Sequence, residues 1–475
     1  MIQNRMDLRS VPRWRAPGIV WPAPPHESDA RMLALQFQYR QTEYWPPPGI
    51  EAQQFRQIEA LVAFCHENIS FWRDRLRRAG LRPGMKLDQR AWARLPILSR
   101  REAQEAGKAL RAKEPPPGHG NVHEGGTSGS TGVPLRFATS DLAQFFWLSM
   151  NLRQALWHNV ASGAGLAVIK QIGAGQDVPT TTKADPDWGA GFEAFATGPL
   201  LAIDSRRPAA EQIDWLIGHR PAYLMTRPSN AIRLARRCLE TGQRLTGLKQ
   251  IFTMGERLTE ETRALCREAL DAGMIDAYSS EEAGLMALQC PDHNHLHVVA
   301  EAVKVEVLDE RGQPCAPGEI GRVVVTPLHN FAMPLLRYEL GDQAEVGAAC
   351  SCGRTLPVLS RILGRANNRI ILPGGEVRIA HWGAELMHQI AGIIQYQVAQ
   401  VAEDEIEYRL VVRNPLTADD EAFLTGMLHR SVGYKFKVRF TYVDDIPPMA
   451  NGKHQEFVAE WAPDQPSSRP ITRAV

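Results

Sequence analysis

Apolar residues recur along the middle of the chain with two different spacings, which predict strands that alternate with helices. Continuous apolar runs at 166–170 and 248–254 are typical of buried strands. Apolar positions three and four residues apart at 229–240 and 259–271 predict amphipathic helices. Strands and helices alternating in this way favour an α/β fold with largely parallel sheets. Two further β runs, 303–309 and 320–326, flank a turn at 309–312 and predict a hairpin.

The C-terminal part of the chain has a different pattern and predicts a small separate unit. Runs with period two at 406–412 and 438–442 enclose a helical run at 418–430. A β-α-β unit of this size can form its own domain. We therefore predict an N-terminal domain of residues 1–365 and a C-terminal lid domain of residues 366–475.

The N-terminal residues are rich in proline and tryptophan and show neither spacing. We expect residues 1–50 to form an irregular arm that ends in the run Trp45-Pro46-Pro47-Pro48. From about Glu51 onward apolar residues recur at helical spacing, which predicts that a long amphipathic helix begins there.

Composition and charge narrow the class of protein. Of the 475 residues, 44% are hydrophobic and 23% are charged, which is ordinary for a soluble globular protein with room for more than one domain. The formal net charge of +1 argues against nucleic acid or an anionic membrane as partner. The seven scattered cysteines argue against a disulfide framework and indicate the reducing cytoplasm.

A run of glycine and hydroxyl residues is the strongest chemical signal. It is Thr127-Ser128-Gly129-Ser130-Thr131-Gly132-Val133-Pro134. Glycines let backbone N–H groups turn inward and the hydroxyls add donors, so the run can wrap phosphate oxygens. No Gly-Lys-Ser/Thr follows, which excludes the P-loop of nucleotide hydrolases. Taken alone, the run is equally consistent with a flexible connection.

Four further motifs follow this loop in order. They are Tyr278-Ser279-Ser280-Glu281-Glu282, Arg337-Tyr338-Glu339-Leu340-Gly341-Asp342, Gly364-Arg365-Ala366-Asn367-Asn368 and Asn451-Gly452-Lys453. The ordered set resembles the adenylate-forming superfamily, and within it the phenylacetate–coenzyme A ligase branch. The runs 68–72 and 333–338 are similar to two further sequence motifs of that branch. The resemblance extends from about Glu51 to Lys453.

The resemblance implies a fold and an activity. The fold is a large N-terminal multi-layer α/β domain with mixed sheets, followed by a small C-terminal α/β lid. The activity is ATP-dependent conversion of a carboxylic acid, aryl or arylacetic, into its acyl-AMP and then into a coenzyme A thioester, with magnesium as cofactor. Transfer to a carrier-protein phosphopantetheine or to an amine, and a non-catalytic nucleotide-binding relative, are the alternatives. A homodimer is one candidate assembly.

The chemistry explains why cationic and hard-oxygen residues are needed. When a carboxylate attacks the α-phosphate of ATP, two anions come together and the site must supply positive charge. The resemblance implies that Lys453 binds the α-phosphate and that the loop 127–132 holds the β- and γ-phosphates. It also implies that Glu282 helps to bind Mg²⁺ through its carboxylate.

The remaining nucleotide contacts come from the same resemblance. Asp342 accepts from the ribose hydroxyls, and Arg365 reaches ribose or phosphate. Tyr278 lies along the adenine, with Gly255 and Glu256 on the other side.

The motifs also depart from the family pattern. Val133 stands where the family often has Lys, which removes one cation near the phosphates. Glu281 and Leu340 each replace a common Thr, and the hinge carries Asn367 and Asn368 in place of an Asp pair. Asn tolerates unusual backbone angles and therefore suits a hinge.

Two short clusters of thiols and imidazoles, at 290–297 and 350–352, indicate a structural zinc site. Thiolate and imidazole are the ligands that zinc prefers. Relatives of the branch carry similar runs, which implies Cys290, Cys350, Cys352 and His297 as the four ligands. His293 is the alternative histidine, and free buried thiols beside a surface histidine cluster are the alternative interpretation.

Overall fold

The computed structural model describes residues 25–127, 134–172, 182–365, 369–379, 390, 392–447 and 454–461. The chain divides into two compact units. The first unit comprises Met1–Leu166, Ala184–Leu201 and Asp276–Ile362, and the second comprises Ala167–Lys183, Ala202–Ile275 and Leu363–Val475. The predicted division at residue 365 stays a prediction.

A seven-stranded sheet forms the centre of the first unit. In order across the sheet its strands are β12 (Val303–Leu308), β13 (Ile320–Pro327), β14 (Tyr338–Val346), β15 (Val358–Arg365), β11 (Leu296–Val298), β10 (Gly284–Gln289) and β9 (Ala277–Ser280). The pairs β12–β13, β13–β14, β15–β11, β11–β10 and β10–β9 are antiparallel. The prediction of largely parallel sheets is therefore wrong here, because no helix connects successive strands between Ala277 and Arg365. The hairpin predicted from the runs 303–309 and 320–326 is confirmed as the antiparallel pair β12–β13.

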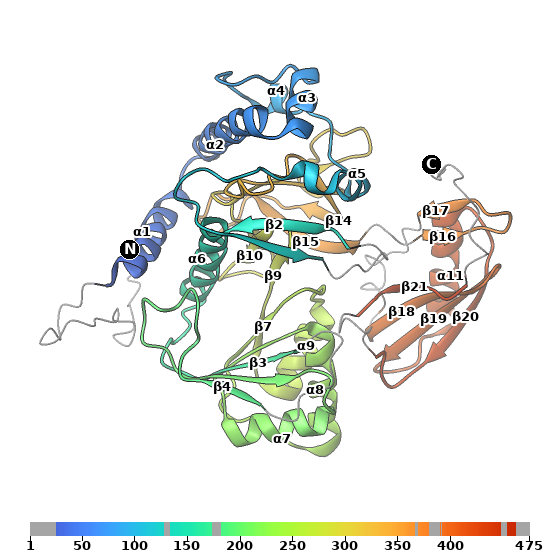
Figure 1. Ribbon diagram of the computed structural model, residues 1–475. Coiled ribbons are helices and arrows are strands. Elements are labelled where there is room, and N and C mark those ends of the chain that lie inside the picture. Colours follow the sequence, from blue (N-terminus) through green and yellow to red (C-terminus); the bar gives the residue numbers. More distant parts are fainter. Residues whose placement is uncertain are drawn as a thin grey trace, which may run out of the picture. The chain divides into compact units, whose positions relative to one another are not determined.

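Helices and a small hairpin accompany this sheet in the first unit (Figure 1). They are α2 (Pro47–Asn68), α3 (Ser70–Arg78), α4 (Gln89–Trp92), α5 (Arg100–Ala106), the 3₁₀ turn η2 (Gly107–Leu110), β1 (Val122–Gly126), β2 (Arg136–Ser140) and α6 (Asp141–Trp157). Helix α2 begins at Pro47 rather than Glu51, because proline fits the first turn of a helix. It buries Phe55, Ile58 and Leu61 in the same core as the sheet.

The prediction of an irregular arm is wrong for Glu27–Thr42, which form helix α1. Its buried face includes the polar residue Gln36, whose Nε2 donates to the Ser149 carbonyl at 2.8 Å. The Tyr39 hydroxyl lies 2.9 Å from the Ser149 hydroxyl. Hydrogen bonds to α6 thus fasten a helix that lacks a continuous apolar stripe. Residues 1–24 lie outside the described part of the chain.

The second unit contains a six-stranded sheet. Its strands in order are β4 (Lys183–Asp185), β5 (Leu200–Asp204), β3 (Leu166–Lys170), β6 (Tyr223–Thr226), β7 (Gln250–Thr253) and β8 (Gly273–Ile275). Strands β6, β7 and β8 are parallel, as predicted. The accompanying helices are α7 (Ala209–His219), α8 (Pro228–Thr241) and α9 (Glu260–Leu270). The predicted strands and helices of this region are confirmed to within a few residues.

The C-terminal residues form sheets of their own. A four-stranded sheet has the order β20 (Lys437–Tyr442), β19 (Glu405–Val412), β18 (Ile393–Ala402) and β21 (Phe457–Ala459), and β16 (Arg369–Ile371) pairs with β17 (Val377–Ile379). Helix α11 (Ala418–Val432) connects the parallel pair β19 and β20, which confirms the predicted β-α-β unit.

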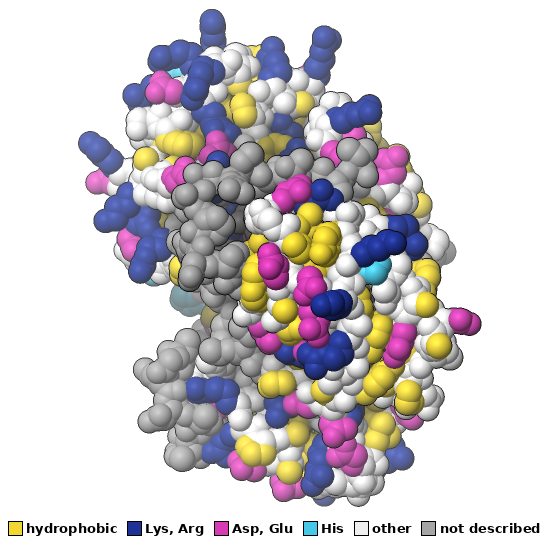
Figure 2. Space-filling view, turned by 90° about the vertical axis from the view of Figure 1, so that its right-hand side faces the viewer, with side chains coloured by type: hydrophobic (Ala, Val, Ile, Leu, Met, Phe, Trp, Pro, Cys, Tyr) yellow, Lys and Arg dark blue, Asp and Glu magenta, His cyan; other side chains and the backbone are white. Residues whose placement is uncertain are grey.

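The surface carries charges of both signs. Basic and acidic side chains are interspersed on the face shown in Figure 2, in agreement with the net charge of +1. Among the described residues, no helix combines the length and the apolar character that crossing a membrane requires.

Candidate functional site

Two of the predicted nucleotide-binding side chains meet in the first unit. Tyr278 lies on β9 and Asp342 on β14, 64 residues apart in sequence, and the Tyr278 hydroxyl donates to Oδ2 of Asp342 at 2.7 Å. The ring of Tyr278 is buried. The phenol therefore orients the carboxylate, and an oriented carboxylate is a suitable acceptor for a pair of hydroxyls.

The predicted magnesium ligand lies beside the first hydroxyl of the glycine-rich loop. The guanidinium of Arg100 joins the two: Nη2 donates to Oγ1 of Thr127 at 2.6 Å, and Nη1 lies 3.2 Å from Oε1 of Glu282. The hydroxyl of Tyr338 also donates to Oε1 of Glu282, at 3.3 Å. Burial and the neighbouring Glu282 carboxylate raise the pKa of Tyr338, which keeps this phenol a donor.

Arg100 is a functional candidate that the motifs do not contain. It is the first residue of α5, whose start is fixed by a capping box in which Ser99 and Glu102 bond to each other's backbone N–H groups. Just before it, the Leu98 N–H donates to the Arg337 carbonyl and the Glu339 N–H donates to the Leu98 carbonyl, both at 2.9 Å. The capping box was visible in the sequence, but the pairing with β14 was not.

Arg337, the first residue of the motif that ends in Asp342, has a structural role instead. Its backbone has a φ of 46°, a left-handed conformation that is uncommon outside glycine. Its guanidinium forms a buried ion pair with Glu306 at 3.1 Å and donates to the Leu95 carbonyl at 2.7 Å. These bonds fasten the segment before α5 to the sheet and stabilise the strained backbone.

Gly255 and Glu256 belong to the second unit. Gly255 has a φ of 72°, which glycine adopts without strain. The Glu256 carboxylate accepts from the N–H and hydroxyl of Ser229 at 3.0 and 3.1 Å, and from the N–H of His454 at 2.7 Å. Glu256 therefore holds the backbone that directly follows Lys453.

Several predicted residues cannot be compared with the geometry. Those that lie outside the described residues are Ser128, Gly129, Ser130, Thr131, Gly132, Asn367, Asn368 and Lys453. Arg365 is described as the last residue of β15. The roles of all of these residues stay predictions.

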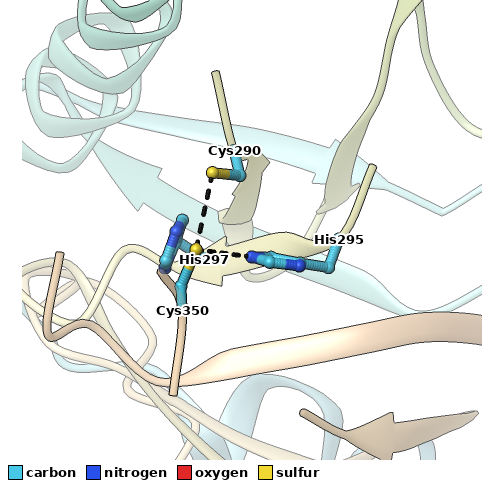
Figure 3. Close-up of side chains that lie close together, drawn as sticks. All are labelled: Cys290, His295, His297 and Cys350. Atoms are coloured by element: carbon cyan, nitrogen blue, oxygen red, sulfur yellow. Dashed lines mark hydrogen bonds between the residues drawn. The ribbon is translucent and has the colours of Figure 1, made fainter. Parts of the chain in front are cut away.

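The cysteines and histidines of the predicted metal site come together in the first unit (Figure 3). Sγ of Cys350 lies 3.8 Å from Sγ of Cys290 and 3.0 Å from Nε2 of His295. One ligand atom from each of Cys290, His295, His297 and Cys350 lies within 4.8 Å of the others. Sγ of Cys352 is 3.4 Å from Nε2 of His297.

The sequence interpretation missed His295. The Cys290 N–H donates to the His295 carbonyl at 2.9 Å, so the turn between β10 and β11 brings the two residues face to face. The alternative ligand His293 instead lies 2.8 Å from the hydroxyl of Ser351. Burial raises the pKa of the Cys290 thiol to about 12. A soft donor set of this kind fits zinc, which deprotonates the thiols it binds.

A buried charge network adjoins this cluster and connects it with α6. The indole of Trp157 donates to Glu43 at 2.9 Å, and Arg354 lies 3.4 Å from the same carboxylate. Arg153, on α6, contacts Glu43 at 3.2 Å. The ring of Trp157 meets the ring of His297 edge to face, with 5.9 Å between the centroids. The cluster is therefore packed against the helix that follows the glycine-rich loop.

Parts of this chain are similar in sequence to known proteins. Residues 376–460 match the CapK C-terminal domain family. A phenylacetate-coenzyme A ligase of Thermus thermophilus is 26% identical over 387 residues, which cover 78% of this chain and 84% of that protein.

Solved structures of 2-hydroxyisobutyryl-CoA ligase share the fold. The structure in the postadenylation state with R3-HIB-AMP has a TM-score of 0.67 and 20% identity, and the match covers 95% of this chain and 97% of that one. The structure in the thioesterification state with 2-HIB-AMP and CoA has a TM-score of 0.57 and 21% identity. That match covers 95% of this chain and 97% of the other. These likenesses confirm the predicted fold class.

Proposed function

We propose that this chain, a relative of phenylacetate-coenzyme A ligase with the fold of the adenylate-forming superfamily, activates a carboxylic acid as acyl-AMP and transfers the acyl group to coenzyme A. One observation carries the proposal. Motif residues from three separate segments, Thr127, Glu282 and Asp342, lie in one unit, and each is held by a hydrogen bond to its side chain. Adenylation needs these three kinds of group together.

The reaction has two steps. A carboxylate oxygen attacks the α-phosphorus of ATP and pyrophosphate leaves, and the thiolate of coenzyme A then attacks the carbonyl carbon and AMP leaves. In the first step Lys453 neutralises charge on the α-phosphate, and the loop 127–132 holds the β- and γ-phosphates through uncharged hydrogen-bond donors. Asp342 accepts hydrogen bonds from the ribose hydroxyls. Bound Mg²⁺ supplies further positive charge, and the hard oxygens of Glu282 fit it as a ligand.

An aryl or arylacetic acid is the substrate class that we propose, because the matched relative is named for phenylacetate. Coenzyme A is the proposed acceptor, and a carrier protein is the alternative. A cytoplasmic location belongs to the same proposal, because none of the seven cysteines forms a disulfide and a reducing compartment preserves that state.

A structural zinc ion is a further part of the proposal. Cys290, Cys350, Cys352 and His297 remain the proposed ligand set, since three thiolates and one imidazole form a closed site. His295 is the alternative to Cys352, because it approaches Cys350 to 3.0 Å. Cys352→Ser and His295→Ala distinguish the two sets, since only loss of a true ligand lowers the zinc content of purified protein.

The experiment for the activity is a panel of acids scored by pyrophosphate release. Arylacetic, benzoic, short hydroxy and straight-chain acids are each incubated with ATP and Mg²⁺, with and without coenzyme A. The proposal expects pyrophosphate release that depends on one class of acid, with sustained turnover only when coenzyme A is present. Turnover with a carrier protein but not with coenzyme A would support the alternative acceptor. No acid-dependent release with any acid would reject both.

A further inference from the structure

The candidate nucleotide site contains a buried cation that no motif supplies. The side chain of Arg100 is 12% exposed and that of its partner Glu282 is 3% exposed. Two of its nitrogens are bonded, Nη2 to Thr127 and Nη1 to Glu282 and Tyr338. Its Nε is buried and has no hydrogen-bond partner among the described residues. Other arginines, Arg153 and Arg354 among them, also have a buried Nε without a partner among the described residues. What distinguishes Arg100 is that its guanidinium contacts Thr127, the first hydroxyl of the glycine-rich loop, so an acceptor bound there can reach this edge.

The hydroxyl of Thr127 is a second donor beside this guanidinium. Its Oγ1 accepts from Arg100 at 2.6 Å and from the Leu135 N–H at 3.0 Å. A hydroxyl has two lone pairs and one proton, so its proton is left to donate to a third group. Arg100 and Thr127 together therefore present N–H and O–H donors side by side at the start of the glycine-rich loop. An oxygen-rich anion is the ligand that such donors recognise.

Glu282 has two competing roles. Its carboxylate accepts from Arg100 and from Tyr338 at Oε1, and in the proposed function it also serves a divalent cation. A guanidinium and a divalent cation both neutralise a carboxylate, so each weakens the hold of the other. A buried ion pair of this kind adds little net stability, because desolvation offsets the attraction.

We infer that Arg100 is a further phosphate-binding residue of this site and that it shares Glu282 with the divalent cation. When the β- and γ-phosphates bind, the guanidinium turns its planar edge to their oxygens beside Thr127 and yields Glu282 to the cation. The inference rests on the proposed function, since it assigns Arg100 to the same phosphates. It predicts opposite changes in two affinities when the guanidinium is removed, a signature that a purely structural arginine does not give.

The test measures binding of inorganic pyrophosphate by calorimetry and of Mn²⁺ alone by electron paramagnetic resonance. Arg100→Ala should weaken pyrophosphate binding about ten- to a hundred-fold, the range for one charged hydrogen-bonding group. It should also tighten Mn²⁺ binding several-fold, because Glu282 loses its competing cation. Arg100→Lys should restore part of the pyrophosphate affinity, since it restores charge without the planar fork. In a Glu282→Gln background, Arg100→Ala should no longer tighten Mn²⁺ binding.

Arg263→Ala is the matched control. The Arg263 side chain is 6% exposed, forms an ion pair with Glu260 at 3.5 Å and donates to the Met274 carbonyl at 2.7 Å, and it belongs to the second unit. Arg263→Ala should lower the melting temperature and leave both affinities unchanged. Arg100→Gln, closer in shape, replaces Arg100→Ala if the latter does not fold.

The outcomes separate this inference from the proposed function. Unchanged pyrophosphate and Mn²⁺ affinities in folded Arg100 variants, or failure of the wild-type protein to bind pyrophosphate, would overturn the inference. Neither measurement requires the acid substrate. An enzyme that forms AMP normally while Arg100→Ala shifts neither affinity keeps the proposed function and loses only the inference. Opposite shifts of the two affinities in a protein that forms no acyl-AMP with any acid would keep the phosphate-binding role of Arg100 and reject the proposed function.

Discussion

Tyr278→Phe should raise the KM for ATP about ten-fold and leave kcat nearly unchanged. The change removes one hydroxyl, which donates to the Asp342 carboxylate at 2.7 Å. The ring is 8% exposed and belongs to the main core of the first unit, so phenylalanine fills the same space and folding stability changes little. A hydrogen bond to a charged group is worth about 1.5–3 kcal/mol, and a ten-fold change in affinity corresponds to about 1.4 kcal/mol.

The loss should appear in KM because ribose is remote from the reacting atoms. Contacts to the ribose are the same in the ground state and in the transition state, so they contribute uniform binding. The assay is steady-state pyrophosphate release at saturating acid and coenzyme A, with ATP, 2′-deoxy-ATP and 3′-deoxy-ATP as substrates. The wild-type enzyme should discriminate against the deoxy nucleotides, and Tyr278→Phe should reduce that discrimination.

Tyr39→Phe is the control for this prediction. The Tyr39 hydroxyl lies 2.9 Å from that of Ser149, between α1 and α6. Tyr39 is also buried but is no part of the predicted nucleotide site. Its removal should leave the KM for ATP unchanged. If Tyr278→Phe lowers kcat alone, or leaves both KM and the discrimination unchanged, Asp342 does not act on ribose in the way we describe.

Three further predictions concern the metal, the pKa of a histidine and the lid. Purified protein should contain about one zinc per chain, and Cys350→Ser should lose zinc and melt at a lower temperature; elemental analysis that finds unchanged zinc would reject the assignment. Burial lowers the pKa of His329 to about 3, and its ring stacks on Phe146 at 3.5 Å between centroids. The imidazole of the unfolded chain takes up a proton at a pKa of about 6.5, so the free energy of unfolding falls as the pH drops below that value. His329→Gln should make the decrease in unfolding free energy between pH 7 and pH 5, measured by urea unfolding, smaller by about 2 kcal/mol. The same decrease in the variant and in the wild-type protein would contradict this prediction. Lys453→Ala should slow adenylation about a hundred-fold or more yet spare thioester formation from a prepared acyl-adenylate, whereas Asn368→Pro should do the reverse; equal damage to both half-reactions by Lys453→Ala would be inconsistent with its role.

The strands and helices with a regular apolar pattern were predictable because their burial follows from their own periodicity. The run 166–170 coincides with β3, and the helix predicted at 418–430 is α11. Helix α1 was missed because Gln36 and Tyr39 fasten it through hydrogen bonds to Ser149, a contact between distant segments. The hairpin β12–β13 was predictable from the turn between its strands, but the other antiparallel pairs of the seven-stranded sheet were missed, because the choice of neighbouring strand is a long-range property that periodicity does not encode.

The candidate site was predictable where a motif names the residue. Tyr278 and Asp342 were assigned separately from two motifs, and their side chains are in contact. Arg100 and His295 were missed for a shared reason: each reaches its site through the backbone pairing of a neighbouring segment. Leu98 pairs with β14 and positions Arg100, and the turn after Cys290 positions His295. No local pattern of residue types reports such pairings.

The central claim is that this chain joins a carboxylate to the α-phosphate of ATP before thiol transfer, and isotope transfer tests it most directly. An acid that is active in the panel is labelled with ¹⁸O in both carboxylate oxygens and incubated with ATP, Mg²⁺ and coenzyme A, and the products are analysed by mass spectrometry. Adenylation predicts one ¹⁸O atom in the AMP and one in the acyl-CoA, because the bridging oxygen stays on phosphorus when the thiol attacks. Unlabelled AMP, or ADP with the label in inorganic phosphate, would contradict the account.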